Sequence, residues 1–332
     1  MSIRLVDIAK ETGFSLNTVS RVLRNDKKIS EATSAIIKAK ADELGYIPNA
    51  LASGMRNSKS NIIGVISVDS SNTFFSSVIK GIEYCASKNG YHILLANTEL
   101  SSKKESEIIK MFLTHKVDGI ISIPLYDNSV LRKELYSNLP VPFVFAGRYL
   151  DGFENHSILH NDYYSQKEII HKLIKNGNKK IIYIEGPDNA SNTFIRKKGV
   201  LDAFEENGLH LSSDYIIKSS AHIEDGYAII NRALHLGLEF SAVVCFNDLI
   251  AMGVLKSLYE NNFKVPKDIE VFGFDNIYSS QFLQPSLSTV DVPKFRLGKL
   301  AIEELIKHIE NSELEYKTIE VATRVIYRET SK

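Results

Sequence analysis

Polar side chains recur at helical spacing in the segment that follows Ser15. They stand at positions i, i+3, i+4 and i+7 and are Asn17, Ser20, Arg21 and Arg24. On a helix they share one side, opposite the apolar residues Val19, Val22 and Leu23. Asparagine and arginine form paired hydrogen bonds with adenine and guanine edges in the major groove of DNA. The spacing therefore indicates a face that reads DNA, with a solvated helix surface as the alternative.

A second set of polar residues follows apolar runs farther along the chain. Open α/β sheets bind ligands beyond the carboxyl ends of their strands, which here are followed by residues 69–75, 147–148, 189–196, 247–248 and 275. These segments offer guanidinium, amide and carboxylate groups together with two phenylalanine rings. Such groups suit a sugar, because the polar ones bind hydroxyls and an aromatic face covers the C–H surface of the ring.

Short helices must position the first set. The pattern predicts one helix from Leu5 to Thr12, ended by Gly13, and a second from 16 to about 24, capped by Ser15. A third helix follows the cap Ser30 and stops at Gly45. Its inward residues are expected to be Ile36, Ile37 and Leu44. Helix, tight turn and helix, with a third helix completing the core, is typical of a helix-turn-helix unit.

Residues 46–61 separate this head from the rest of the chain. Pro48 breaks the preceding helix, and Asn49 begins a segment to 56 that is too short to persist as an isolated helix. Gly54 weakens helix formation further, by up to about 1 kcal/mol. The polar residues 57–61 then form a linker, so the composition predicts a domain boundary here.

Strands and helices alternate in the body. Apolar runs predict strands at 62–68, 91–96, 119–123, 142–146, 181–185, 242–246 and 270–274. Helical patterns lie between or after them, at about 74–89, 103–115, 163–176, 194–207, 224–235, 248–261 and 294–310. This alternation predicts an α/β fold with parallel sheets covered on both faces. The pattern is too long for one such sheet, so two similar lobes are expected, divided near Asn161.

Composition and charge narrow the class of protein. The chain has 332 residues, 44% of them hydrophobic, and it lacks an apolar run long enough to span a membrane. Its net charge of zero divides into +4 for residues 1–60 and −4 for 61–332, which favours a nucleic-acid-binding head on a different domain. The charged N-terminus and the two isolated cysteines, Cys85 and Cys245, predict a cytoplasmic protein without disulfides.

Several segments resemble the LacI/GalR family of bacterial transcription regulators. In the head they are residues 5–9, 13–15, 18–23 and 46–52, and in the body they include 63–65, 72–75, 117–121, 196–199, 246–248, 273–276 and 328–330. The resemblance implies a helix-turn-helix headpiece at 1–47 and a hinge helix with linker at 48–60. It further implies a two-lobed, type I periplasmic-binding-protein-like effector domain. The N-lobe is expected at 61–160 and 291–319 and the C-lobe at 161–290 and 320–332.

The same resemblance implies a homodimer bound to a near-palindromic operator. The positions that correspond to DNA contacts are Leu5, Ser15, Leu16, Asn17, Thr18, Ser20, Arg21, Arg24, Asn49, Ala52, Met55 and Arg56. Met55 stands where the family usually inserts a leucine into the minor groove. Arg24 and Gly54 depart from the residues common at their positions, so operator preference and hinge stability do not carry over.

For the body, the resemblance implies an effector cleft between the lobes. The corresponding residues are Phe74, Phe75, Arg148, Asn192, Arg196, Asn247 and Asp275. Arg196 and Asp275 either contact the ligand or form a structural ion pair. His160 and His222 are expected as surface or hydrogen-bonding histidines rather than ligand contacts. No metal and no cofactor are implied.

Catalytic motifs are missing from the sequence. It contains no His-Glu-x-x-His, Cys-x-x-Cys or Gly-x-Ser-x-Gly and no phosphate-binding Gly-x-x-x-x-Gly-Lys-Ser/Thr, so an enzyme is not expected.

The predicted function is an allosteric transcriptional repressor of a carbohydrate-utilisation operon, released from DNA by a sugar. The alternatives are a corepressor-dependent regulator and a global carbon-catabolite regulator with a phosphoprotein partner. From other classes, a sugar-binding transport-type protein and an enzyme with a recombinase-like head stay open. Since the sequence ends at Lys332, two residues after the 328–330 segment, no tetramerising C-terminal heptad is expected.

Overall fold

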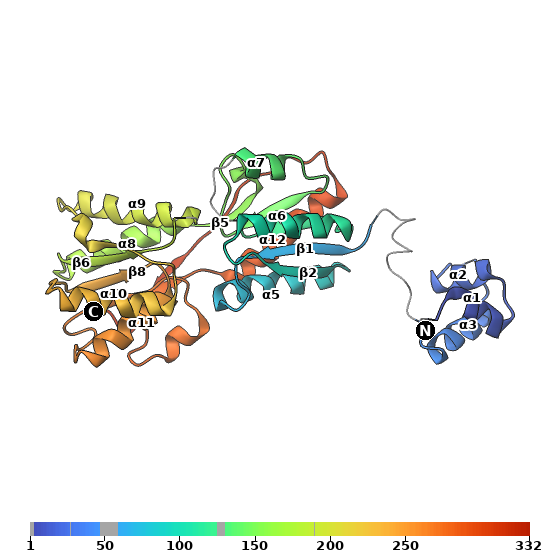
Figure 1. The fold of residues 1–332 in the computed structure, drawn as a ribbon, viewed down its shortest axis with the longest axis horizontal. Helices are drawn as coiled ribbons and strands as arrows, with labels where there is room; N and C mark the ends of the chain where they lie inside the picture. The colour runs from blue at the N-terminus through green and yellow to red at the C-terminus, as the bar shows by residue number, and fades with distance from the viewer. Residues whose placement is uncertain (1–2, 27, 47–58, 125–129, 189) are drawn as a thin grey trace. The chain divides into compact units, whose positions relative to one another are not determined.

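The computed structural model describes residues 3–26, 28–46, 59–124, 130–188 and 190–332 (Figure 1). The chain divides into two compact units, Met1–Ser60 and Asn61–Lys332. No helix within the described ranges is long and apolar enough to cross a membrane.

Helices α1 (Leu5–Thr12), α2 (Leu16–Leu23) and α3 (Glu31–Glu43) build the first unit. The Ser15 hydroxyl accepts the Thr18 backbone N–H at 3.1 Å, and Ser30 accepts that of Thr33 at 3.3 Å. Both predicted N-caps are therefore confirmed. Gly13 ends α1 in the left-handed region, with φ 72°.

The core of this unit is small and apolar. Its buried residues are Ile8, Val19, Val22, Ile37 and Ala41. The expectation that Ile36 points inward is wrong, because its side chain is 54% exposed. Ile37 and Ala41 lie four residues apart and share the inward face of α3, whereas Ile36 is rotated about 100° from Ile37.

The N-lobe of the second unit is built on a six-stranded sheet with the order β11-β5-β4-β3-β1-β2, in which all neighbouring strands are parallel. The strands are β1 (Ile62–Ser67), β2 (His92–Asn97), β3 (Gly119–Ser122), β4 (Phe143–Ala146), β5 (Ser157–His160) and β11 (Ile319–Val321). Helices α5 (Thr73–Lys88) and α12 (Lys294–Glu310) pack together, and α6 (Ser102–Thr114), α7 (Val130–Ser137) and the 3-10 turn η1 (Glu154–His156) complete the lobe.

Alternation along β1 explains this layering. Ile63 and Val65 belong to the apolar cluster that includes residues of α5 and α12, while Ile66 belongs to the cluster of α6. Gly64 faces α6, where an added Cβ would lie 2.3 Å from the Phe112 ring. The sheet is therefore buried on both faces, as its apolar strands predict.

The C-lobe repeats the arrangement around a four-stranded parallel sheet with the order β7-β6-β8-β9. Its strands are β6 (Ile181–Glu185), β7 (Ile216–Lys218), β8 (Ala242–Cys245) and β9 (Glu270–Phe272). Helices α8 (Asp162–Lys175) and α9 (Ser191–Glu206) pack together, as do α10 (Ile223–His235) and α11 (Asp248–Glu260), and the two pairs lie on opposite sides of the sheet (Figure 1). The 3-10 turns are η2 (Ser213–Tyr215) and η3 (Tyr278–Phe282).

The chain passes from lobe to lobe where short strands meet. β5 leads into α8, and β10 (Thr289–Asp291) leads into α12. β12 (Arg324–Ile326) follows β11 and pairs antiparallel with β10. β11 stays paired with β5 as far as Val321, so this sheet continues past 319, where the N-lobe was expected to end.

The apolar patterns did not predict five short strands and one helix. They are β5, β7, β10, β11 and β12, each of three or four residues, and the eight-residue α7. β3 and β4 are equally short but buried at every position, so they lie within apolar runs and were predicted.

Candidate functional site

Helix α2 presents polar residues predicted to read DNA. Asn17 and Arg24 are exposed, and Arg21 is half-buried. Arg21 donates from Nε to the Asp26 carboxylate at 2.8 Å, and Arg24 donates from Nε to the Ser20 backbone oxygen at 2.9 Å. Arginine has five N–H donors, so both guanidinium groups keep donors for a base or a phosphate.

Other predicted DNA contacts have different surroundings. Leu16 is 52% exposed, whereas Leu5 packs against the apolar core of the head. The Ser15 hydroxyl lies 2.9 Å from the Thr18 hydroxyl and caps α2, so both side chains already have partners. The predicted hinge contacts Asn49, Ala52, Met55 and Arg56 lie outside the described residues.

All seven residues predicted for the effector cleft border one cavity of the second unit. The cavity holds about 700 Å³ of space, including space open to solvent. The residues are Phe74, Phe75, Arg148, Asn192, Arg196, Asn247 and Asp275. They come from both lobes and follow, or lie in helices that follow, β1, β4, β6, β8 and β9. This is the edge at which parallel sheets bind ligands.

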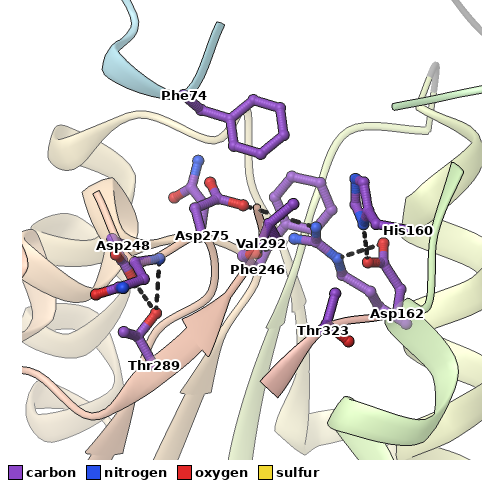
Figure 2. A network of polar contacts seen from close by, with 12 residues as sticks. Phe74, His160, Asp162, Phe246, Asp248, Asp275, Thr289, Val292 and Thr323 are labelled. Atoms are coloured by element: carbon purple, nitrogen blue, oxygen red, sulfur yellow. Dashed lines mark hydrogen bonds and ion pairs between the residues drawn. The ribbon is translucent and has the colours of Figure 1, made fainter. Parts of the chain in front are cut away.

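Arg196 is the centre of a buried polar network. Its side chain is 1% exposed and donates from Nε to Asp162 at 2.9 Å. Nη1 donates to the Phe246 backbone oxygen, and Nη2 lies 3.7 Å from the Asp275 carboxylate. Figure 2 shows Asp162 beside His160, and Asp275 on the other side of the view. The guanidinium carbon of Arg196 also lies 3.5 Å from the ring centroid of Phe274. The cation is therefore held by charge, hydrogen bonds and an aromatic face.

The two carboxyls beside Arg196 differ in protonation. Burial would raise the pKa of Asp162, but Arg196 and His160 outweigh it and the pKa lies below its ordinary value. Burial raises the pKa of Asp275 to about 8, against the opposing charge of Arg196. Asp162 is therefore an anion at neutral pH, and Asp275 is mainly a neutral acid that can donate a hydrogen bond.

Asp275 sits in a strained turn of the C-lobe that follows β9. Its φ is 111° and that of Asn276 is 48°, conformations that side-chain-bearing residues rarely adopt. The ammonium group of Lys294, at the start of α12, donates to the backbone oxygens of Asp275, Asn276 and Val292. The N-lobe helix α12 is thereby tied to the turn that carries the C-lobe carboxyl.

Two family models match the chain and identify the family to which it belongs. The model for periplasmic binding proteins and the sugar-binding domain of the LacI family matches residues 60–328. The model for bacterial regulatory proteins of the lacI family matches residues 4–49. The chain belongs to the LacI family.

Three proteins that are similar to the chain are transcription regulators. The chain is 30% identical over 335 residues to the HTH-type transcriptional repressor PurR of Vibrio parahaemolyticus, with 98% of each chain covered. It is similar to the transcription regulator CcpA of Lactococcus lactis, with 27% identity, a TM-score of 0.75 and coverage of 82% of this chain and 99% of that one. The lac repressor dimer bound to operator and the anti-inducer ONPF has the same fold, with a TM-score of 0.88, 22% identity and coverage of 100% and 99%. This LacI-family chain is thus a DNA-binding transcriptional repressor and not an enzyme.

The polar residues of the LacI-family cleft differ in how far they are already engaged. Asn247 caps α11 by accepting the Ile250 N–H at 2.9 Å and also donates to the Ala221 backbone oxygen at 3.0 Å. Asn192, by contrast, is 8% exposed and has an amide oxygen without a partner in the described structure. The amide of Asn192 is therefore the freer of the two.

Asp162, His160 and Phe246 are contacts of the network that the strand-end rule did not select. Asp162 begins α8, is fully buried and binds both Arg196 and the Nδ1 of His160. His160, which was expected at the surface or in a hydrogen bond rather than in contact with a ligand, is buried, hydrogen-bonds to Asp162 and borders the cavity. The signal available in the sequence was the spacing of two between His160 and Asp162 at the end of a strand, which is too common to single out. Among the described residues no group of three or more His, Cys, Asp or Glu is arranged to hold a metal ion.

Proposed function

We propose that this LacI-family repressor controls a carbohydrate-utilisation operon and leaves its operator when a sugar or sugar derivative binds the cleft. The observation that carries the proposal is the polar cavity between the lobes, bordered by buried groups from both and by the rings of Phe74 and Phe75. A ligand that contacts both lobes favours one lobe arrangement over others, which is the basis of allosteric coupling.

The DNA side of the proposal concerns α2 as the recognition helix of a homodimer. A two-fold dimer requires a near-palindromic operator, with one α2 in each half-site. Asn17 and Arg24 have side chains exposed for such contacts. The hinge contacts Asn49, Ala52, Met55 and Arg56 belong to this proposal as expectations from the sequence.

A corepressor-dependent repressor and a carbon-catabolite regulator with a phosphoprotein partner are the other candidates. The similarity to CcpA, at 27% identity, supports the carbon-catabolite regulator as a candidate. All three candidates share the headpiece and the cleft, and they differ in the sign of the ligand's effect on operator affinity and in the need for a partner protein.

The test measures operator affinity with and without candidate effectors. Operator DNA is first selected from a random pool with the full chain, and its affinity is then measured by fluorescence anisotropy against a panel of sugars and sugar derivatives. Weakening of about 5–150-fold by one of them supports the proposal, since allosteric coupling usually lies in that range. Tightening would instead identify a corepressor, and the absence of any effect without a second protein would favour the catabolite regulator.

The variant for this test must spare the buried network. Arg196→Ala removes the ion-pair partner of Asp162, so it destabilises the folded protein as well as altering the cleft. Asn192→Ala is preferable because its amide oxygen has no partner in the described structure. We expect Asn192→Ala to keep operator affinity and to weaken the effector response, because it removes a buried group available to the ligand.

A further inference from the structure

Buried polar atoms of three side chains around the cleft lack a hydrogen-bond partner in the described structure. They are Nη1 of Arg148, Nε2 of His160 and Oδ1 of Asn192. The side chains belong to residues that are only 8%, 6% and 8% exposed. A buried donor or acceptor without a partner is costly, so such atoms are available to a group that enters the cavity.

Arg148 is the cation of this set. It follows β4, and its guanidinium carbon lies 5.7 Å from the ring centroid of Phe75. Burial and the neighbouring charge of Arg196 lower its pKa to about 10, so it remains protonated at neutral pH. The ion pairs found among the described residues do not include Arg148.

The carboxyls whose charges act on Arg148 are Asp275 and Asp162, and neither neutralises it. Asp162 is bound by the Nε of Arg196 at 2.9 Å and by His160. Asp275 lies nearest to Arg196, at 3.7 Å, and its pKa of about 8 keeps it mainly neutral at pH 7. The Arg148 guanidinium therefore lies buried without an ion-pair partner of its own among the described residues.

We propose that the effector carries an anionic group, a carboxylate or a phosphate, and that Arg148 binds this group. The proposal rests on the proposed function, because it names the chemical class of the ligand for the same cleft. A guanidinium forms charge-assisted, often bidentate hydrogen bonds with either anion. A neutral sugar would offer hydroxyls to Arg148 but would leave its charge buried and unneutralised.

The other two unpartnered groups suit the remainder of an acidic sugar. Nδ1 of His160 faces the Asp162 carboxylate, which leaves Nε2 as the ring atom for a ligand. The amide oxygen of Asn192 is a hydrogen-bond acceptor. These two groups come from different lobes and can bind sugar hydroxyls while the acidic group pairs with Arg148.

The first experiment uses simple anions as probes. Melting temperatures of the full chain, Arg148→Met and the control Arg232→Met are measured in chloride and in acetate or inorganic phosphate of equal ionic strength. Arg232 is an exposed arginine of α10 and reports the nonspecific effect of losing a charge. We expect Arg148→Met to raise the melting temperature in chloride, since it removes an uncompensated buried cation. Acetate or phosphate should stabilise the wild type and the control but not Arg148→Met, and the stronger of the two anions identifies the acidic group.

The second experiment pairs sugar acids and sugar phosphates with their neutral parent sugars. Binding is measured by calorimetry on the wild type, Arg148→Gln and Arg148→Lys, with operator release recorded separately. The tightest ligand should be acidic, should lose at least tenfold in affinity in Arg148→Gln and should recover part of it in Arg148→Lys.

Two results would overturn the inference. One is a lower melting temperature of Arg148→Met in chloride together with an unchanged response to both anions. The other is a neutral sugar that binds wild type and Arg148→Gln equally and releases the operator, in which case the proposed function stands. Conversely, an acidic ligand that depends on Arg148 but leaves operator affinity unchanged would support the inference and refute the proposed function.

Discussion

Replacing Asp275 with asparagine should make the protein more stable at neutral pH. The carboxyl is buried, its nearest cation is 3.7 Å away, and its pKa is raised to about 8 from 3.8. Asparagine keeps the size and polarity of the side chain and tolerates a positive φ better than most residues. The substitution therefore removes the titration without forcing a change of backbone.

The magnitude follows from the linkage between proton binding and folding. Between pH 4 and pH 8 the native state retains the Asp275 proton that the unfolded chain loses. The native state then binds more protons, so the unfolding free energy falls as pH rises, by about 1.4 kcal/mol per pH unit at most. Over pH 5 to 7 this amounts to about 3 kcal/mol, and relaxation of the interior could halve it. We therefore compare the unfolding free energy of Asp275→Asn with that of wild type at each pH. The advantage of the variant should be about 1.5–3 kcal/mol larger at pH 7 than at pH 5.

Urea unfolding at pH 5, 6, 7 and 8 measures this difference. Protein concentration is held fixed, because the stability of the proposed dimer depends on it. Asp202→Asn is the control, since hydrogen bonds from Lys198 and Tyr163 lower the pKa of this surface carboxylate. The unfolding free energy of Asp202→Asn should therefore still fall as pH rises, as it does in wild type. If Asp275→Asn and wild type show the same pH dependence, then the carboxyl is ionised in the native protein and the account of its burial is refuted.

Three further substitutions test other parts of the molecule. Asn17→Ala should cost about 1–3 kcal/mol at one base position per half-site in competition with operator variants, whereas uniform weakening on all DNA would make Asn17 a phosphate contact. Arg196→Met should lower the unfolding free energy by about 3–5 kcal/mol because it strands the Asp162 carboxylate, and adding Asp162→Asn should restore part of the loss; additive losses would contradict the pairing. Gly298→Ala should destabilise the N-lobe by about 1–3 kcal/mol, since its Cβ would lie 2.0 Å from the Val78 backbone oxygen, and an unchanged melting temperature would show that α5 and α12 can separate freely.

Local sequence was sufficient for the headpiece. Helix α2 and its Ser15 cap depend on residues within one turn of each other, so their spacing along the chain already places them in space. Apolar runs likewise identified strands such as β1 and β6, because a strand buried on both faces needs an apolar side chain at nearly every position. The resemblance to the LacI/GalR family then supplied the seven residues that border the cleft.

Tertiary structure alone decided how the cleft residues share their charges and hydrogen bonds. The sequence does not reveal that Arg196 is paired with Asp162, that Asn247 is engaged as a helix cap, or that Arg148 lacks a counterion. Asp162 and Arg196 are separated by 34 residues and meet because Asp162 begins α8, directly after β5, and Arg196 lies in the first half of α9. The pKa values and free donors of such groups depend on burial and on neighbours brought together by the crossings between lobes, and sequence spacing records neither of these.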